Sequence, residues 1–130
     1  MSGAYLDASA LVKLVVTERE TAALRTFLRG HSQRFTNRVA VVEVTRAVRR
    51  RDARRSAPLK DAFEGVAVIE LDSGITERAG VLEPAALRAL DAMHLATALA
   101  LAEEVAVFVT YDTRQADAAR ELGLAVEAPS

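Results

Sequence analysis

The sequence predicts an α/β fold: a three-layer α/β/α sandwich in which helices cover both faces of a parallel sheet of about five strands. Short runs rich in β-branched residues alternate with helical stretches along the chain, and this alternation is typical of βαβ units. The 130 residues fit one domain spanning residues 1–130, because a chain of this length buries roughly two-thirds of its unfolded surface in one core. The composition, 51% apolar and 27% charged, is that of an ordinary globular domain.

The expected elements follow from local composition, and several boundaries have a physical cause. Ser9 and Ser73 are expected to cap the helices that begin beside them, and Gly123 to end the last helix. Pro84 is expected to separate two helices, which puts Asp91 in the first turn of the second. Strands are expected at residues 4–6, 34–36, 66–71, 105–110 and 125–127, and helices at residues 9–16, 20–29, 40–53, 59–63, 73–82, 90–103 and 113–122.

Composition also limits the kinds of catalytic site, metal site and partner that the chain can have. The chain has no Cys, which excludes disulfides, thiolate nucleophiles and thiolate zinc sites, so a metal would need oxygen ligands or His31 and His94. There is no secretory leader pattern and no apolar run approaching 18 residues, so we expect a cytoplasmic protein with no membrane contact. The net charge of −1 argues against general coating of nucleic acid, although six arginines lie between Arg46 and Arg55.

Two aspartates follow predicted strands directly. Asp7 comes after "AYL" and Asp112 after "VFVTY". Ligands of open α/β sheets bind beyond the carboxyl ends of the strands, so both carboxylates are expected at one edge. Either residue alone is equally well explained as a cap of the following helix.

Two further acids stand in helices that are otherwise apolar, Glu43 in "VAVVEVTRAV" and Asp91 in "LDAMHLATAL". For a single acid of this kind, a salt bridge or a side chain reaching solvent is the alternative explanation. A shared divalent cation would satisfy all four carboxylates together. A site made only of carboxylates suits Mg²⁺ or Mn²⁺ and indicates phosphoryl chemistry with an activated water, for which no protein nucleophile is required.

Four segments carry a family resemblance. They are "YLDASALVKL", "RVAVVEVTRA", "LRALDAMHLATAL" and "VTYDTRQADAARELGL". Together they resemble the acidic signatures of PIN-domain ribonucleases, most of all the VapC toxins of bacterial toxin–antitoxin pairs, in order and spacing over nearly the whole chain. The resemblance implies a PIN-like fold and Mg²⁺- or Mn²⁺-dependent endonucleolytic hydrolysis of RNA, with Asp7, Glu43, Asp91 and Asp112 as the catalytic and metal-binding residues.

The resemblance also implies partners. The substrate would be structured RNA, often tRNA or rRNA, and the inhibitor a VapB-type antitoxin that wraps the toxin's helices and often places a basic residue in the acidic site. A homodimer is usual in this family. One departure is Gln115, where the family usually has an apolar residue.

Other polar residues have two readings each. Thr110 either supports the acidic site or only favours the strand, and Ser9 either bonds a catalytic carboxylate or only caps a helix. His94, three residues after Asp91, is a supporting partner or, more often in such a place, a core or interface residue. Asp117 is expected to be a solvated surface residue, and His31 to be exposed.

Arg46 and Arg50 share the helical stripe of Glu43. They are expected to contact either RNA phosphates or the antitoxin, with Arg49, Arg51, Arg54 and Arg55 weaker candidates. The few aromatic residues favour recognition of RNA shape and phosphates over base stacking.

Two other functions fit parts of the pattern. A catalytically silent PIN-like module would bind a partner without cleaving RNA, but it has no physical need for four mutually repelling carboxylates. A receiver-type signalling domain also has acids at strand ends, and Asp72 would suit it, but the chain lacks the required acidic pair after its first strand and the lysine after its last.

Overall fold

The computed structural model describes residues 3–51 and 57–130. Within them the chain forms a five-stranded, fully parallel sheet with strand order β3-β2-β1-β4-β5. This confirms the predicted parallel sheet. It also removes the receiver alternative, since receiver domains have the order 2-1-3-4-5. The strands are β1 (Gly3–Leu6), β2 (Arg34–Asn37), β3 (Val66–Ile69), β4 (Val105–Val109) and β5 (Val126–Glu127).

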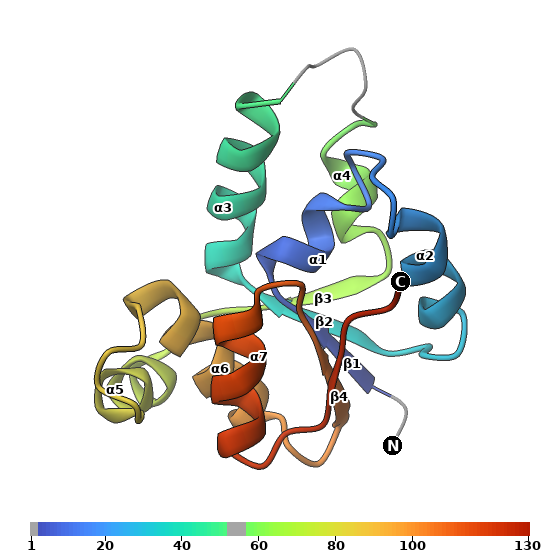
Figure 1. The fold of residues 1–130 in the computed structure, drawn as a ribbon. Coiled ribbons are helices and arrows are strands. Elements are labelled where there is room, and N and C mark those ends of the chain that lie inside the picture. The colour runs from blue at the N-terminus through green and yellow to red at the C-terminus, as the bar shows by residue number, and fades with distance from the viewer. Residues whose placement is uncertain (1–2, 52–56) are drawn as a thin grey trace.

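Helices cover both faces of the sheet and complete the three layers (Figure 1). Alternate residues of β1 face opposite layers, as the pleat of a strand requires: Leu6 packs with the first four helices, and Tyr5 packs with α6 and α7. The helices are α1 (Ala8–Val12), α2 (Thr21–Leu28), α3 (Arg38–Arg49), α4 (Lys60–Phe63), α5 (Ser73–Val81), α6 (Ala89–Ala100) and α7 (Thr113–Glu121).

Both expected serine caps are wrong. The side chain of Asp7 accepts the backbone N–H of Ala10, and that of Asp72 accepts the backbone N–H of Ile75. In each case an aspartate just before the serine already occupies the cap position, and its carboxylate satisfies a free N–H of the first turn. The other two boundary predictions are confirmed: Gly123 has φ +89° at the end of α7, and α5 and α6 are separate helices around Pro84.

Several element lengths also differ from expectation. The first helix ends at Val12 instead of Val16, because the N–H groups of the next three residues, from Lys13 to Val15, bond the carbonyl three residues back instead of four. The third helix begins at Arg38 because Asn37, the last residue of β2, caps it through Ala40 N–H. The expected end of this helix, Ala53, falls outside the described residues, as do Arg54 and Arg55. No helix in the described ranges has the length and apolarity to cross a bilayer.

Candidate active site

The four predicted acids lie beyond the carboxyl edge of the sheet, contributed by four different segments. Asp7 follows β1 and Asp112 follows β4, and these strands are parallel neighbours with Leu6 opposite Val109. Glu43 lies on α3, and Asp91 lies in the first turn of α6. The crossover connections of a parallel sheet therefore bring together acids that are up to 105 residues apart (112 − 7).

Asp7 is the most buried of the four, with 5% of its surface exposed. Its carboxylate accepts hydrogen bonds from the Ser9 hydroxyl at 2.6 Å, the Thr110 hydroxyl at 2.5 Å and the Ala10 N–H at 3.2 Å. Burial raises the pKa of Asp7 above its usual value, and the charge of His94 together with these three bonds offsets the rise only in part. Asp7 therefore both caps α1 and presents a buried carboxylate at the site.

Thr110 and Ser9 hold the aspartates in place. Besides its bond to Asp7, the Thr110 hydroxyl accepts the backbone N–H of Asp112 at 3.1 Å, so one side chain connects the acids of β1 and β4. Ser9 bonds the Asp7 carboxylate and accepts the N–H of Tyr111 at 2.9 Å. Of the two sequence readings of Ser9, the structure favours the carboxylate bond over the cap.

Glu43 is held by a buried histidine. His94 Nε2 lies 2.6 Å from Glu43 Oε1, and His94 Nδ1 lies 2.8 Å from the hydroxyl of Tyr5. Both ring nitrogens of His94 therefore have a hydrogen-bond partner, one on β1 and one on α3. His94 is fully buried, as the core interpretation of the sequence expects, and it also contacts one of the four acids, as the supporting interpretation expects.

Asp91 and Asp112 share one cation that sequence reasoning missed. Arg88 Nε lies 3.0 Å from Asp91 Oδ2, and its terminal NH2 nitrogen lies 3.2 Å from Asp112 Oδ2. The bond and charge of Asp91, and then the charge of Asp112, raise the pKa of Arg88 above its usual value. The salt-bridge alternative for Asp91 is therefore observed. The i,i+3 spacing of Arg88 and Asp91 was the signal for it.

The carboxylate oxygens of the four acids are suitable ligands for a hard cation, although each carboxylate already contacts a protein group. Carboxylate oxygens are the ligands that Mg²⁺ and Mn²⁺ prefer. In the part of the chain that the structure describes, no three acidic or histidine side chains are arranged closely enough to ligate one ion. Arg88 stands between two of the acids and His94 faces a third, so an ion can bind between the carboxylates only when one of these contacts opens.

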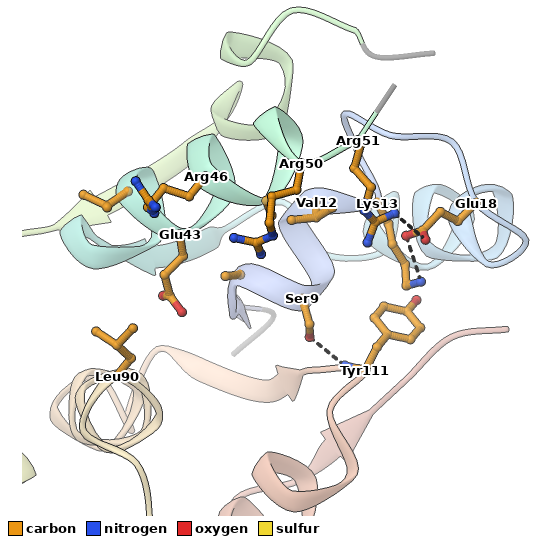
Figure 2. Close-up of a pocket in the computed structure, with 13 residues that line it drawn as sticks. Ser9, Val12, Lys13, Glu18, Glu43, Arg46, Arg50, Arg51, Leu90 and Tyr111 are labelled. Atoms are coloured by element: carbon orange, nitrogen blue, oxygen red, sulfur yellow. Dashed lines mark hydrogen bonds and ion pairs between the residues drawn. The ribbon is translucent and has the colours of Figure 1, made fainter. Parts of the chain in front are cut away.

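A groove of about 540 Å³ begins beside Glu43 (Figure 2). Glu43 and Arg50 point from α3 into the space between α1 and α6, and Leu90 faces them from α6. Arg46 also lines the groove, and Val12 is part of its apolar lining. The predicted pair Arg46 and Arg50 thus lines the same groove as Glu43, which is the one of the four acids that lines it. The other weak candidates divide: Arg51 lines the groove, and Arg49 does not.

The far end of the groove is a network of ion pairs. Lys13 contacts Glu18 and Glu20, each at 3.3 Å, and lies 4.5 Å from the ring centre of Tyr111. Arg51 also contacts Glu18, at 3.0 Å. Burial raises the pKa of Glu18, but the bonds and charges of Arg51 and Lys13 bring it below its usual value. Burial and the charge of Glu20 raise the pKa of Tyr111 to about 12. This network occupies the charge of Arg51, and Arg46 and Arg50 are the other two arginines that line the groove.

Three remaining predictions concern single side chains. Gln115 is fully buried: its Nε2 donates to the carbonyl of Asp91 at 3.2 Å, and its Oε1 has no hydrogen-bond partner among residues 3–51 and 57–130. Asp117 is exposed and pairs with Arg120 at 3.7 Å, in agreement with a solvated residue. His31, expected to be exposed, is half-buried with its ring 4.6 Å from that of Phe27.

Known proteins resemble this chain in sequence and in fold. The PIN domain model matches residues 4–121. Ribonuclease VapC46 of Mycobacterium tuberculosis is 42% identical over 130 residues, the whole of both chains, and ribonuclease VapC47 of the same species is 38% identical with 96% of each chain covered.

Solved structures have the same architecture. A toxin–antitoxin complex from Klebsiella pneumoniae has a chain that superposes with a TM-score of 0.70 at 22% identity, covering 98% of each chain. VapBC2 from Rickettsia felis, bound to a promoter DNA fragment, gives a TM-score of 0.71 at 13% identity, covering 98% of this chain and 99% of the other. The chain therefore belongs to the PIN domain family and, within it, to the VapC ribonuclease toxins.

Proposed function

We propose that residues 1–130 act as one PIN domain, a Mg²⁺- or Mn²⁺-dependent endoribonuclease that hydrolyses structured RNA, tRNA or rRNA, as the toxin of a toxin–antitoxin pair. The observation that supports the proposal is the position of Asp7, Glu43, Asp91 and Asp112 beyond one edge of the sheet, where Arg88 contacts both Asp91 and Asp112. Four carboxylates repel one another, and a divalent cation is what makes their proximity favourable. Such RNA lies in the cytoplasm, where we expect the chain to act.

Each acid has a distinct support in the proposed reaction. Asp91 and Asp112 would ligate the ion from α6 and from the end of β4, and Glu43 and Asp7 would complete its acidic surroundings. When bound, the ion supplies Lewis acidity and lowers the pKa of water. The chain's part is to fix the carboxylates: Thr110 and Ser9 hold Asp7.

The groove beside Glu43 supports RNA and antitoxin contacts. Arg46 and Arg50 line it together with Glu43, and there they would attract the phosphates of a structured RNA. The apolar side chains of Val42 and Leu90 are exposed on its rim and would pack against the C-terminal segment of a VapB-type antitoxin. The homodimer is proposed from the family resemblance.

The test is cleavage of total RNA by variants that remove one charge and little volume. With Mg²⁺ or Mn²⁺, Asp91→Asn and Glu43→Gln are expected to lose cleavage and growth inhibition with unchanged circular dichroism, and the wild type to lose cleavage in excess EDTA. Asp72→Asn is the matched control, because it removes the same charge from a helix cap that lines none of the described grooves. Loss of folding in the active-site variants would indicate structural salt bridges instead.

A second candidate function has its own support. Each acid is already bonded by the chain, most clearly through the Arg88 and His94 contacts, and no three acids converge. A catalytically silent module that binds a partner would look the same. Wild-type protein that binds its partner but cleaves no RNA with either metal would establish this alternative.

A further inference from the structure

Arg88 occupies a position that helix stability does not explain. It is the N-cap residue of α6, and its side chain makes no capping bond. A positive charge at a helix N-terminus is electrostatically unfavourable, since the helix dipole is positive there. Its guanidinium nevertheless reaches around the first turn to Asp91 and across to Asp112 on the next segment. The contacts that hold Arg88 are therefore those to the two acids.

The guanidinium of Arg88 occupies the place that a metal ion would take between the two acids. It presents two donors to one oxygen of Asp91 and one oxygen of Asp112, at 3.0 and 3.2 Å. The repulsion between these carboxylates is relieved by a single positive charge placed between them. A divalent ion ligated by the same two oxygens would need the same space, because a hard cation binds carboxylates at about 2.0–2.6 Å.

A second groove beside Arg88 offers its side chain another position. With 63% of its side chain exposed, it lines a second groove of about 290 Å³ on the other side of Asp91. Asp117 and Glu121 of α7 line the same groove and offer acceptors to a displaced guanidinium. Two arrangements are thus available to one flexible side chain, one between the site acids and one over α7.

We propose that Arg88 is a resident counter-ion of the acidic site, which a divalent cation must displace from between Asp91 and Asp112, so that this arginine sets the metal affinity. The inference rests on the proposed metal dependence. Metal and guanidinium then compete for the same two oxygens, and a metal-free site is kept closed by the chain itself. Removing Arg88 frees both carboxylates and is expected to tighten metal binding about two- to thirtyfold, the range for losing two exposed ion pairs.

The experiment is Mn²⁺ titration of metal-free protein by isothermal titration calorimetry, with no RNA present. Wild type, Arg88→Gln and Arg38→Gln are compared. Arg38 is the matched control, because it is a similarly exposed arginine, at 53%, paired with a carboxylate, Glu70, away from both grooves. We expect a Mn²⁺ dissociation constant about two- to thirtyfold lower for Arg88→Gln and a change of less than about twofold for Arg38→Gln.

The outcomes separate this inference from the proposed function. Mn²⁺ binding by the wild type that is unchanged or weaker in Arg88→Gln overturns the counter-ion role and leaves metal dependence standing. Absence of binding by both proteins overturns both. Should Arg88→Gln fail to fold, Arg88→Lys decides by the same measurement: lysine cannot bridge both acids with a planar fork, so tighter binding than wild type supports the role and unchanged binding overturns it.

Discussion

Asp7→Asn is expected to abolish cleavage and at the same time to stabilise the metal-free protein. The substitution keeps the volume of the side chain and removes a charge that is 5% exposed. Asparagine can still accept from Ser9 and Ala10 through its carbonyl oxygen, and its amide can donate to the Thr110 hydroxyl. The stability lost through weaker hydrogen bonds can therefore be compared with the stability gained by removing a buried charge.

The magnitude follows from the three hydrogen bonds of the carboxylate. A bond to a charged group contributes about 1.5–3 kcal/mol and a neutral bond about 0.5–1.5 kcal/mol, so the variant gives up about 1 kcal/mol at each. Burying the ionised carboxylate costs several kcal/mol. Because the pKa of Asp7 is raised by burial, the second effect is the larger. We expect a net gain of about 1 kcal/mol, or about 4 °C in Tm for a domain of this size.

The gain depends on pH in a defined direction. With its pKa raised in the folded state, Asp7 binds a proton more readily folded than unfolded, so its contribution to stability falls as pH rises through the window between the two pKa values. Asparagine lacks this loss. The advantage of Asp7→Asn is therefore greatest above the folded pKa and disappears below the unfolded one.

The assay is thermal unfolding by circular dichroism in EDTA at pH 7.5 and pH 5.0. Asp72→Asn is the control, since Asn and Asp cap helices about equally well, and its change should stay within about 0.5 kcal/mol. A lower Tm for Asp7→Asn than for wild type at pH 7.5, with the control unchanged, would refute the dominance of desolvation. Added Mg²⁺ should raise the Tm of the wild type and of Asp72→Asn, but not that of Asp7→Asn.

Two further predictions concern the groove and α7. Arg46→Ala should weaken binding to RNA of every sequence and reduce the slope of log K against log salt by about one, measured by fluorescence anisotropy. An unchanged slope would assign Arg46 to the antitoxin. The control is Arg38→Ala, which loses an exposed ion pair with Glu70. Gln115→Leu should raise stability by about 1 kcal/mol in urea unfolding, because the unpartnered Oε1 costs about 1–3 kcal/mol and the lost Nε2 bond contributes about 0.5–1.5 kcal/mol. A less stable variant would mean that the bond to Asp91 dominates.

Much of the fold could be predicted because its signals are local. Alternating β-rich and helical segments specify a parallel sheet, but the strand order β3-β2-β1-β4-β5 came from the structure, because the same alternation also fits the order of receiver domains. Element ends were less predictable. The serine caps failed because Asp7 and Asp72, each just upstream, compete for the same free N–H groups, and sequence alone does not rank two adjacent cap formers.

By itself, the sequence singled out the acids that we propose for the site. Asp7 and Asp112 follow strands that must end at one edge, and Asp91 falls in a first turn because Pro84 cannot continue a helix. Only the tertiary structure decided what each acid touches. Arg88 joins Asp91 to Asp112, and His94 reaches Glu43 from another helix. Such contacts depend on side-chain directions across elements, within a few tenths of an ångström, and no residue spacing records them.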